Sequence, residues 1–308
     1  MSKKIIIFGS LNMDFSIECD EVPKQGQTIE GKNLLISDGG KGANQALACQ
    51  KLGANVLMIG SVGNDAFAPA LINNLKSHGI NTENIKISSN CSSGTAFIIR
   101  SNNDNRIIIN KGANHSIDEN EIKEILNTLY KKGEIKKDDI FIAQFECNIK
   151  ATFEALKLAK ELGLFTIFNP APAKEIDKDI YKYIDLFIVN QSEAEFYTNI
   201  NTDTKACLKA LLDLGAREII LTLSSDGSAY KNKEVEKFFK AYKVNPIDTT
   251  AAGDTFIGAL AASLANAKTI DEAIDFGSKA AALSTLKLGA QSSIPSIDEV
   301  NNFSKDTK

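Results

Sequence analysis

Apolar and polar positions follow two repeating patterns along most of the chain. Short apolar runs are typical of buried strands, whereas longer stretches with apolar residues three or four positions apart are typical of helices. The short runs predict strands at residues 5–8, 56–59, 140–143, 165–168, 186–189 and 218–223. The longer stretches predict helices at residues 42–52, 65–77, 150–162, 203–214, 254–265 and 271–286. Because strands and helices alternate, we expect an α/β fold: a doubly wound, mostly parallel sheet with helices on both faces.

Two stretches of the chain, residues 15–37 and 92–110, do not follow this alternation. The second contains two short extended patterns, 96–99 and 106–109, on either side of the turn-forming residues 102–105. Such a pair is typical of a hairpin rather than of a strand–helix–strand crossover. We therefore expect a small β-sheet lid, residues 15–37 and 92–110, inserted into an α/β body that comprises residues 1–14, 38–91 and 111–308.

The composition of the 308-residue chain is that of an ordinary globular protein, with 43% hydrophobic and 24% charged residues. A net charge of -4 and the lack of a long basic run argue against nucleic acid or an anionic membrane as a partner. The first apolar run is too short for a signal peptide, and no segment approaches the roughly 20 apolar residues of a membrane span. Five cysteines without Cys-x-x-Cys spacing and two histidines predict reduced thiols, a cytoplasmic location and no His-rich or Cys-rich metal site.

One segment combines small residues with a carboxylate at the expected start of a helix. Residues 248–256 read Asp-Thr-Thr-Ala-Ala-Gly-Asp-Thr-Phe, and a long apolar stretch follows. The small residues Ala251, Ala252 and Gly253 let backbone N–H groups approach an anion, and the helix N-terminus adds roughly half a positive charge. Packing alone explains poorly why an acid lies beside such an anion hole. We expect Asp254 to act as a general base that takes a proton from a hydroxyl while the hole holds the phosphoryl group under attack.

Polar residues near the first strand and the first helix form a second candidate. Asn12 and Asp14 follow the first strand, where ligands bind in doubly wound sheets, although both residue types are as common in plain turns. Residues 38–45 read Asp-Gly-Gly-Lys-Gly-Ala-Asn-Gln, and helix capping rarely requires so much glycine. This loop, from which Lys41 and Asn44 project, suits either a phosphate or sugar hydroxyls.

Two further motifs have an ordinary structural explanation beside a functional one. Asn190 and Glu193 have the Asn-x-x-Glu spacing of a helix capping box, which locally outweighs a role in orienting magnesium-bound water. Residues 221–227 read Leu-Thr-Leu-Ser-Ser-Asp-Gly. An Asp-Gly turn is sufficient to explain a hairpin there, although a nucleotide could also lie along this strand.

Taken in order along nearly the whole chain, these segments resemble the ribokinase family of carbohydrate kinases. The most specific parts are residues 39–46 and 248–254, which match the family's two signature regions, and residues 169–173 and 190–195 support them. The resemblance implies the ribokinase-like fold and ATP-dependent phosphorylation of D-ribose at its 5-hydroxyl, which gives D-ribose 5-phosphate.

Other activities stay open beside this one. The nearest is the same reaction on deoxyribose, fructose, a keto-deoxy sugar acid or a nucleoside. A sugar-binding sensor without catalysis is less favoured, because a sensor would not need Asp254 and the anion hole. A nucleotide-dependent dehydrogenase is disfavoured, since no Gly-x-Gly-x-x-Gly follows the first strand.

The resemblance also implies roles residue by residue. The sugar-binding positions are Asn12, Asp14, Gly40, Lys41, Asn44, Glu146 and Asp254. Asp254 matches the catalytic base, and Ala251, Ala252 and Gly253 match the anion hole. The nucleotide-binding positions are Asn190, Thr222, Leu223, Ser224, Ser225, Asp226, Gly227, Gly253 and Ser278. Glu193 belongs to the element that organises magnesium and phosphate.

Cofactors and a partner chain follow from the same resemblance. The implied cofactors are ATP, Mg²⁺ and a monovalent cation, usually K⁺, that binds behind the anion hole. The cation ligands, several of them backbone carbonyls, are expected at Asp248, Thr250, Ser284, Lys287, Gly289 and Ser293. Ribokinase-like members dimerise through the lid, so we expect a homodimer.

The chain departs from the family pattern at a few positions that carry no reacting group. Ser224 replaces a frequent glycine, Val189 stands where a proline is frequent, and Ser292 replaces a proline near the cation loop. Met13 and Phe15 flank Asp14 and bear on which pentose fits.

Overall fold

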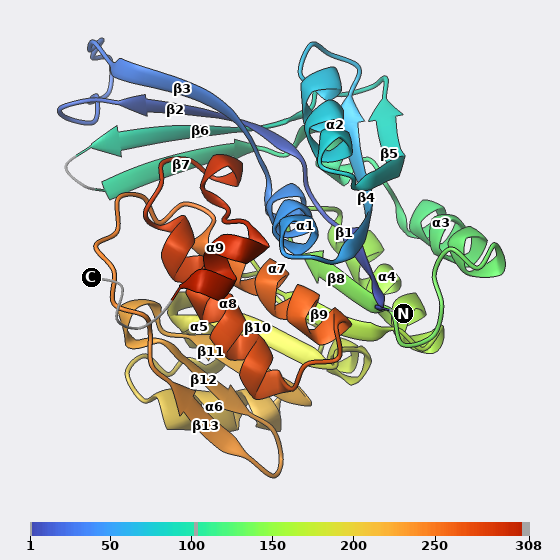
Figure 1. Cartoon of the computed structure of the whole chain (residues 1–308). Coiled ribbons are helices and arrows are strands. Elements are labelled where there is room, and N and C mark those ends of the chain that lie inside the picture. The colour runs from blue at the N-terminus through green and yellow to red at the C-terminus, as the bar shows by residue number, and fades with distance from the viewer. Residues whose placement is uncertain (1, 102–103, 304–308) are drawn as a thin grey trace.

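The computed structural model describes residues 2–101 and 104–303, and a nine-stranded sheet forms its centre (Figure 1). In spatial order the strands are β13 (Glu236–Phe239), β12 (Ser228–Lys231), β11 (Glu218–Thr222), β10 (Leu186–Asn190), β9 (Phe165–Asn169), β8 (Ile140–Gln144), β1 (Lys4–Phe8), β4 (Asn55–Gly63) and β5 (Asn81–Ser88). Neighbouring strands run parallel from β11 to β5, whereas β12 and β13 extend the sheet antiparallel. The carboxyl ends of the parallel strands therefore meet along one edge of the sheet.

Helices cover both faces of this sheet (Figure 1). One layer contains α1 (Lys41–Lys51), α2 (Ala68–Ser77), α7 (Ala252–Ala265), α8 (Ile270–Ser284) and α9 (Ile297–Asn302). The other contains α3 (Glu119–Lys131), α4 (Ile149–Glu161), α5 (Gln191–Thr198) and α6 (Thr204–Asp213). Side chains alternate between the faces of a strand, so Ile5 and Ile7 pack in the first layer and Ile6 and Phe8 in the second. All four are fully buried, which accounts for the continuous apolar run of β1.

A second, four-stranded sheet extends away from the body at the top of Figure 1. Its spatial order is β3 (Lys32–Gly39), β2 (Asn12–Glu18), β6 (Gly94–Ser101) and β7 (Asp104–Asn110). The strand register forms one row across the sheet from Ser37, Asp14, Ala96 and Ile109, and the next row from Ile36, Phe15, Phe97 and Ile108. Because adjacent residues of a strand point to opposite faces, the Asp14 row, which contains the polar Ser37 and Asp14, and the apolar Phe15 row lie on opposite faces of the sheet.

The expected fold class is confirmed, while several element boundaries differ. The expected helix 65–77 begins only at Ala68, because the Asp65 carboxylate accepts hydrogen bonds from the backbone N–H groups of Phe67 and Ala68 before the first turn. Strand β5, helices α3 and α9, and the edge strand β13 were not predicted, whereas α5 follows the expected capping box and β12 completes the expected hairpin with β11. The turn expected at 102–105 includes residues 102 and 103, which lie outside the described residues.

The smaller sheet also reaches further than expected. Strand β2 begins at Asn12 and β3 ends at Gly39, so Asn12 and Asp14, expected in the body, already pair with both neighbouring strands. The division of the chain into a body and a lid stays a prediction. Within residues 2–101 and 104–303, no helix is long and apolar enough to cross a membrane.

Candidate active site

The candidate residues gather at the carboxyl-terminal edge of the large sheet. Ser10 follows β1, Glu146 follows β8, Asn190 ends β10 and Thr222 ends β11. In doubly wound sheets this edge is where ligands bind, because loops from neighbouring strands open there. The strand order thus brings together residues from widely separated parts of the chain.

Asp254 is held from two sides by amide groups of α1. Its Oδ2 accepts a hydrogen bond from Asn44 Nδ2 at 3.0 Å, and its Oδ1 accepts one from Gln45 Nε2 at 2.9 Å. Helices α1 and α7 approach closely because Gly258 has no side chain: a Cβ there would lie 2.4 Å from the Cβ of Ala48. The carboxylate is buried, with 7% of the residue exposed, and its orientation is fixed before any ligand binds.

Two buried acceptor atoms in the candidate site lack a hydrogen-bond partner. Asp14 Oδ1 and Asn44 Oδ1 are enclosed and have no hydrogen-bond partner within the described residues. Buried polar atoms are normally paired, so each is suited to accept a hydrogen bond from a sugar hydroxyl. Gly39 makes room for this arrangement, since a Cβ at Gly39 would lie 2.1 Å from Asp14 Oδ2.

The electrostatic surroundings of Asp14 oppose its ionisation. Burial, followed by the carboxylates of Glu146, Asp254 and Asp38, raises the pKa of Asp14 to about 7. The charged form of Asp14 is therefore costly until a ligand donates hydrogen bonds to it.

Lys41 supplies the positive charge among these carboxylates. Burial by itself lowers the pKa of Lys41, but Asp254, Glu146 and Glu193 outweigh this effect, so the net pKa is raised. Glu146 in turn accepts hydrogen bonds from the Lys41 backbone N–H at 3.2 Å and from Ser10 Oγ at 2.5 Å. The lysine, the expected base and the expected sugar-binding carboxylates thus share one site.

The start of α7 has the conformation expected of an anion-binding turn. Ala251 adopts a left-handed conformation with φ 59°, which is strained for a residue with a side chain and is typical of functional turns. Gly253 is exposed, and a Cβ there would meet no atom within 4 Å, so its backbone faces open space. The N–H of Ala252 donates to the carbonyl of Thr249 at 3.2 Å.

The expected nucleotide-binding residues lie along the neighbouring strand ends. Asn190 and Glu193 form a reciprocal capping box at the start of α5, which confirms the structural explanation of their spacing. Asn190 pairs in register with Thr222, and a 3-10 turn (Ser224–Asp226) leads through Gly227 into β12. Ser224 has φ 53°, so the position where the family often has glycine is indeed left-handed in this chain.

The remaining candidate, Ser278, comes from a helix rather than from a strand end. It lies on α8, and its hydroxyl donates to the carbonyl of Ile274 at 2.8 Å. The roles of all these residues toward a nucleotide stay predictions.

Three of the expected cation ligands, Asp248, Thr250 and Gly289, are joined in a loop cluster around the Asp248 carboxylate. Its Oδ1 accepts from the backbone N–H and the hydroxyl of Thr250, at 2.9 and 2.6 Å, and its Oδ2 accepts from the N–H of Gly289 at 2.9 Å. Burial alone would raise the pKa of Asp248, yet these hydrogen bonds and the charge of Arg100 lower it. Asp248 is therefore an ionised anchor that ties the two loops together.

The remaining expected cation ligands differ in the direction of their side chains. The hydroxyls of the fully buried Ser284 and Ser293 donate to the carbonyls of Ala281 and Ala290. The ammonium of Lys287 pairs with Glu299 at 2.7 Å on the surface, which leaves only its backbone carbonyl for a cation.

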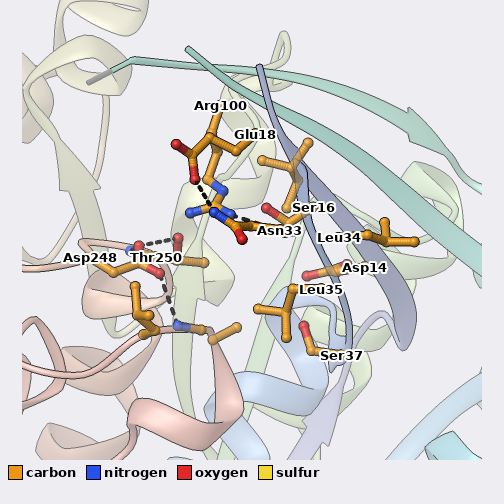
Figure 2. A pocket seen from close by; sticks show the side chains of 14 residues that line it. Asp14, Ser16, Glu18, Asn33, Leu34, Leu35, Ser37, Arg100, Asp248 and Thr250 are labelled. Carbon is orange, nitrogen blue, oxygen red and sulfur yellow. Dashed lines mark hydrogen bonds between the residues drawn. The ribbon is translucent and has the colours of Figure 1, made fainter. Parts of the chain in front are cut away.

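A pocket of about 440 Å³ lies between the smaller sheet and the loops around Asp248 and Gly289 (Figure 2). On the sheet side it is lined by the face that carries Asp14, with Ser16, Glu18 and Arg100 further out. Asp14 lines the pocket and Asp254 does not, so this space gives access to Asp14, the expected sugar-binding carboxylate, and not to Asp254, the expected base.

Four residues that position the site were not predicted from the sequence. Gln45 and Gln144 are linked to Asp254, Ser10 binds Glu146, and Asn114 donates to Asn12 Oδ1 at 2.7 Å. The sequence offered one signal for Gln144, which is a polar residue at the end of an otherwise apolar strand. For Gln45 the signal was its position directly after Asn44 on the same helix.

Comparison with known proteins gives matches over nearly the full chain. The sequence profile of the pfkB family carbohydrate kinase matches residues 2–297. The ribokinase of Haemophilus influenzae is 35% identical over 308 residues, which cover 98% of this chain and 99% of that protein. The deoxyribokinase of Salmonella typhi is also 35% identical, over 305 residues that cover 97% of this chain and 98% of that protein. The structure of Arabidopsis thaliana ribokinase with ribose and ATP has a TM-score of 0.88 and 27% identity, with coverage of 99% of this chain and 100% of that one. The chain therefore belongs to the pfkB family of carbohydrate kinases.

Proposed function

We propose that this carbohydrate kinase transfers the γ-phosphoryl group of ATP to the 5-hydroxyl of D-ribose, which gives D-ribose 5-phosphate and ADP. The observation that carries the proposal is the buried Asp254, whose two carboxylate oxygens are fixed by amides beside the open backbone of Gly253. A fixed base next to an anion-binding helix start suits phosphoryl transfer to an alcohol. The likeness to ribokinases, one of them solved with ribose and ATP, supports ribose as the acceptor.

In the proposed reaction Asp254 accepts the proton of the sugar hydroxyl. The hydroxyl oxygen forms a bond to the γ-phosphorus of ATP, and the bond between that phosphorus and the ADP oxygen breaks. Asp14 and Asn44 orient the sugar through their unpaired acceptor atoms. The N-terminus of α7, at Ala251 to Gly253, stabilises charge on the transferring group, and such positioning and charge stabilisation supply most of the catalysis in this reaction class.

Magnesium fits the proposal as an ion carried by the nucleotide. When bound, Mg²⁺ neutralises charge on the ATP phosphates. No cluster of three or more His, Cys, Asp or Glu side chains among residues 2–101 and 104–303 is arranged to hold a metal without such phosphates. Glu193 is buried, and the charges of Lys41 and Asp254 act on it. We propose that its carboxylate helps to organise the magnesium ion and the phosphates.

A monovalent cation fits the loop cluster around Asp248. The ionised carboxylate, the Thr250 hydroxyl and the carbonyls of the adjoining loops are oxygen donors, which hard cations prefer. We propose that Asp248, Thr250, Ser284, Lys287, Gly289 and Ser293 hold K⁺ at this place, next to the start of α7.

The substrate is tested with a panel of acceptors. Purified enzyme is incubated with ATP and D-ribose, 2-deoxy-D-ribose, fructose, a keto-deoxy sugar acid or a nucleoside, in K⁺ or Na⁺ buffer, and ADP release is measured. We expect the highest kcat/KM for ribose and faster turnover in K⁺. A preference for deoxyribose would replace the proposed substrate, because a deoxyribokinase is as similar to this chain as a ribokinase is. Sugar binding without ADP release would identify a sensor.

We also propose that the chain forms a homodimer through its smaller sheet. On the Phe15 face of this sheet, Ile36, Phe97 and Ile108 expose 53%, 47% and 65% of their surface. An exposed apolar row of this kind is typical of an interaction surface. We expect Ile108→Lys to convert a dimer into a monomer, measured by light scattering after size-exclusion chromatography. A monomeric parent chain would contradict the proposal.

A further inference from the structure

Two buried glutamines connect Asp254 to the end of a central strand. Gln45, on α1, donates through Nε2 to Asp254 Oδ1 at 2.9 Å. Its Oε1 accepts from Gln144 Nε2, at the end of β8, at 2.6 Å. Gln45 is fully buried and Gln144 is 1% exposed, so water does not compete for these bonds.

The order of the two bonds fixes which end of the Gln45 amide faces the base. An amide has an acceptor oxygen at one end and a donor nitrogen at the other. Gln144 donates to the oxygen of Gln45 and Asp254 accepts from its nitrogen, so both neighbours favour the same orientation of the Gln45 amide, while Gln144 Oε1 has no partner among the described residues. A reversed Gln45 would present its oxygen to a carboxylate oxygen, which is repulsive.

The backbone around Gln144 is built to admit this side chain. A Cβ at Gly9 would lie 2.4 Å from Gln144 Oε1 and 2.5 Å from the Cα of Gly42. Gly9 thus leaves space for the amide of Gln144, while Gly42 lets the start of α1 approach the backbone of Gly9 and Ser10. A purely apolar residue at position 144 would fit a buried strand end equally well, so packing alone does not explain the amide.

We propose that Gln144 and Gln45 form a two-amide relay that positions the catalytic carboxylate. With Asn44 on Oδ2 and Gln45 on Oδ1, one lone pair of each oxygen is occupied, and the carboxylate presents its remaining lone pairs to the acceptor hydroxyl. Gln45 and Gln144 touch no substrate in this arrangement, so they are positioning residues. The inference rests on the proposed function of Asp254 as the base.

The test is the substitution Gln45→Met, which keeps the length of the side chain and removes the donor. We expect kcat to fall by roughly ten- to a hundredfold, as for the loss of a hydrogen bond to a charged group, while the KM for sugar changes less than about threefold. The donated bond stabilises the carboxylate over its protonated form, so its loss moves the acid limb of the kcat–pH profile to higher pH. The other charged groups that act on Asp254 are Lys41 on α1, Asp14 on β2 and Glu193 on α5, and all three are retained.

A double-mutant cycle separates a relay from two independent structural roles. Gln144→Met is expected to move the acid limb in the same direction by a smaller amount, because Gln45 keeps its donor but loses its fixed orientation. In Gln45→Met/Gln144→Met the second change should add nothing to the first. If the effects of the two single substitutions on kcat multiply in the double variant, or if either single variant keeps the parental acid limb, the relay is overturned.

Gln50→Met makes the same chemical change near the other end of α1 and serves as the control for stability.

A second measurement does not require turnover. The ¹³C resonance of the Asp254 carboxyl, assigned by its absence in Asp254→Asn, is titrated by NMR in the parent and in each glutamine variant. We expect its midpoint at higher pH in Gln45→Met, and an unchanged midpoint would overturn the relay. If the parent phosphorylates no sugar of the panel, the proposed function fails while this titration still decides the relay. Gln144→Met provides the same readout if Gln45→Met does not fold.

Discussion

Asp254→Asn is expected to lower kcat for sugar phosphorylation by about 10²- to 10⁴-fold, the usual contribution of a general base. The variant cannot accept the hydroxyl proton, while the proposed sugar-binding acceptors Asp14 and Asn44 and the start of α7 are retained. The Kd for ribose should therefore change little. Steady-state ADP release gives kcat, and isothermal calorimetry gives the sugar affinity.

The hydrogen bonds around Asp254 add a second expectation for this variant. Both carboxylate oxygens accept from amide nitrogens, so an asparagine must present its own nitrogen to one of these donors. Asp254→Asn should for this reason lower the melting temperature slightly, whereas Asp298→Asn, in the exposed first turn of α9, should not. Phosphorylation by Asp254→Asn at near the parental rate would show that Asp254 is not the base.

The fold was largely predictable because its signals are local. Buried strands such as β1 are continuous apolar runs with helices between them, and this alternation allows few sheet topologies. Two of the elements that were missed carry weak signals. The edge strand β13, Glu236–Phe239, is charged and partly exposed, and α9 is only six residues long. Helix α3, by contrast, has Asp118 as its N-cap and buried Ile122, Leu126 and Leu129 at helical spacing, so its signal was present in the sequence.

The site was predictable only as far as its motifs are contiguous. The start of α7 and the glycine loop before α1 each stand in one short segment, so Asp254 and Lys41 could be found from the sequence. Gln144 lies 99 positions from Gln45, and Asn114 lies 102 positions from Asn12, so only the folded chain shows that these residues are partners. The pKa of Asp14 could not be predicted for the same reason, since it depends on burial and on Glu146, Asp254 and Asp38.

Asp14→Asn is expected to stabilise the ligand-free protein and to weaken sugar binding. Burial raises the pKa of Asp14 from 3.8 to about 7, so the folded state binds this proton more tightly than the unfolded state does. The stability associated with Asp14 is therefore greatest below pH 4 and is lost as the pH rises to 7. Well above pH 7 the ionised carboxylate costs roughly 4 kcal/mol, and asparagine removes that cost. We expect the melting temperature at pH 8 to rise by several degrees.

The same charge makes Asp14 valuable once sugar is bound. A hydrogen bond from a hydroxyl to an ionised carboxylate contributes about 1.5–3 kcal/mol, so losing it should raise the Kd for ribose about 10- to 150-fold. In the parent enzyme the Kd should rise as the pH falls below about 7, because the protonated carboxyl is a poorer acceptor, and Asp14→Asn should abolish this dependence. Calorimetric titrations with ribose at several pH values measure both effects, with Asp298→Asn, in the exposed first turn of α9 and not among the charges that act on Asp14, as the control. A variant that binds ribose as tightly as the parent and melts no higher would place Asp14 outside the sugar site.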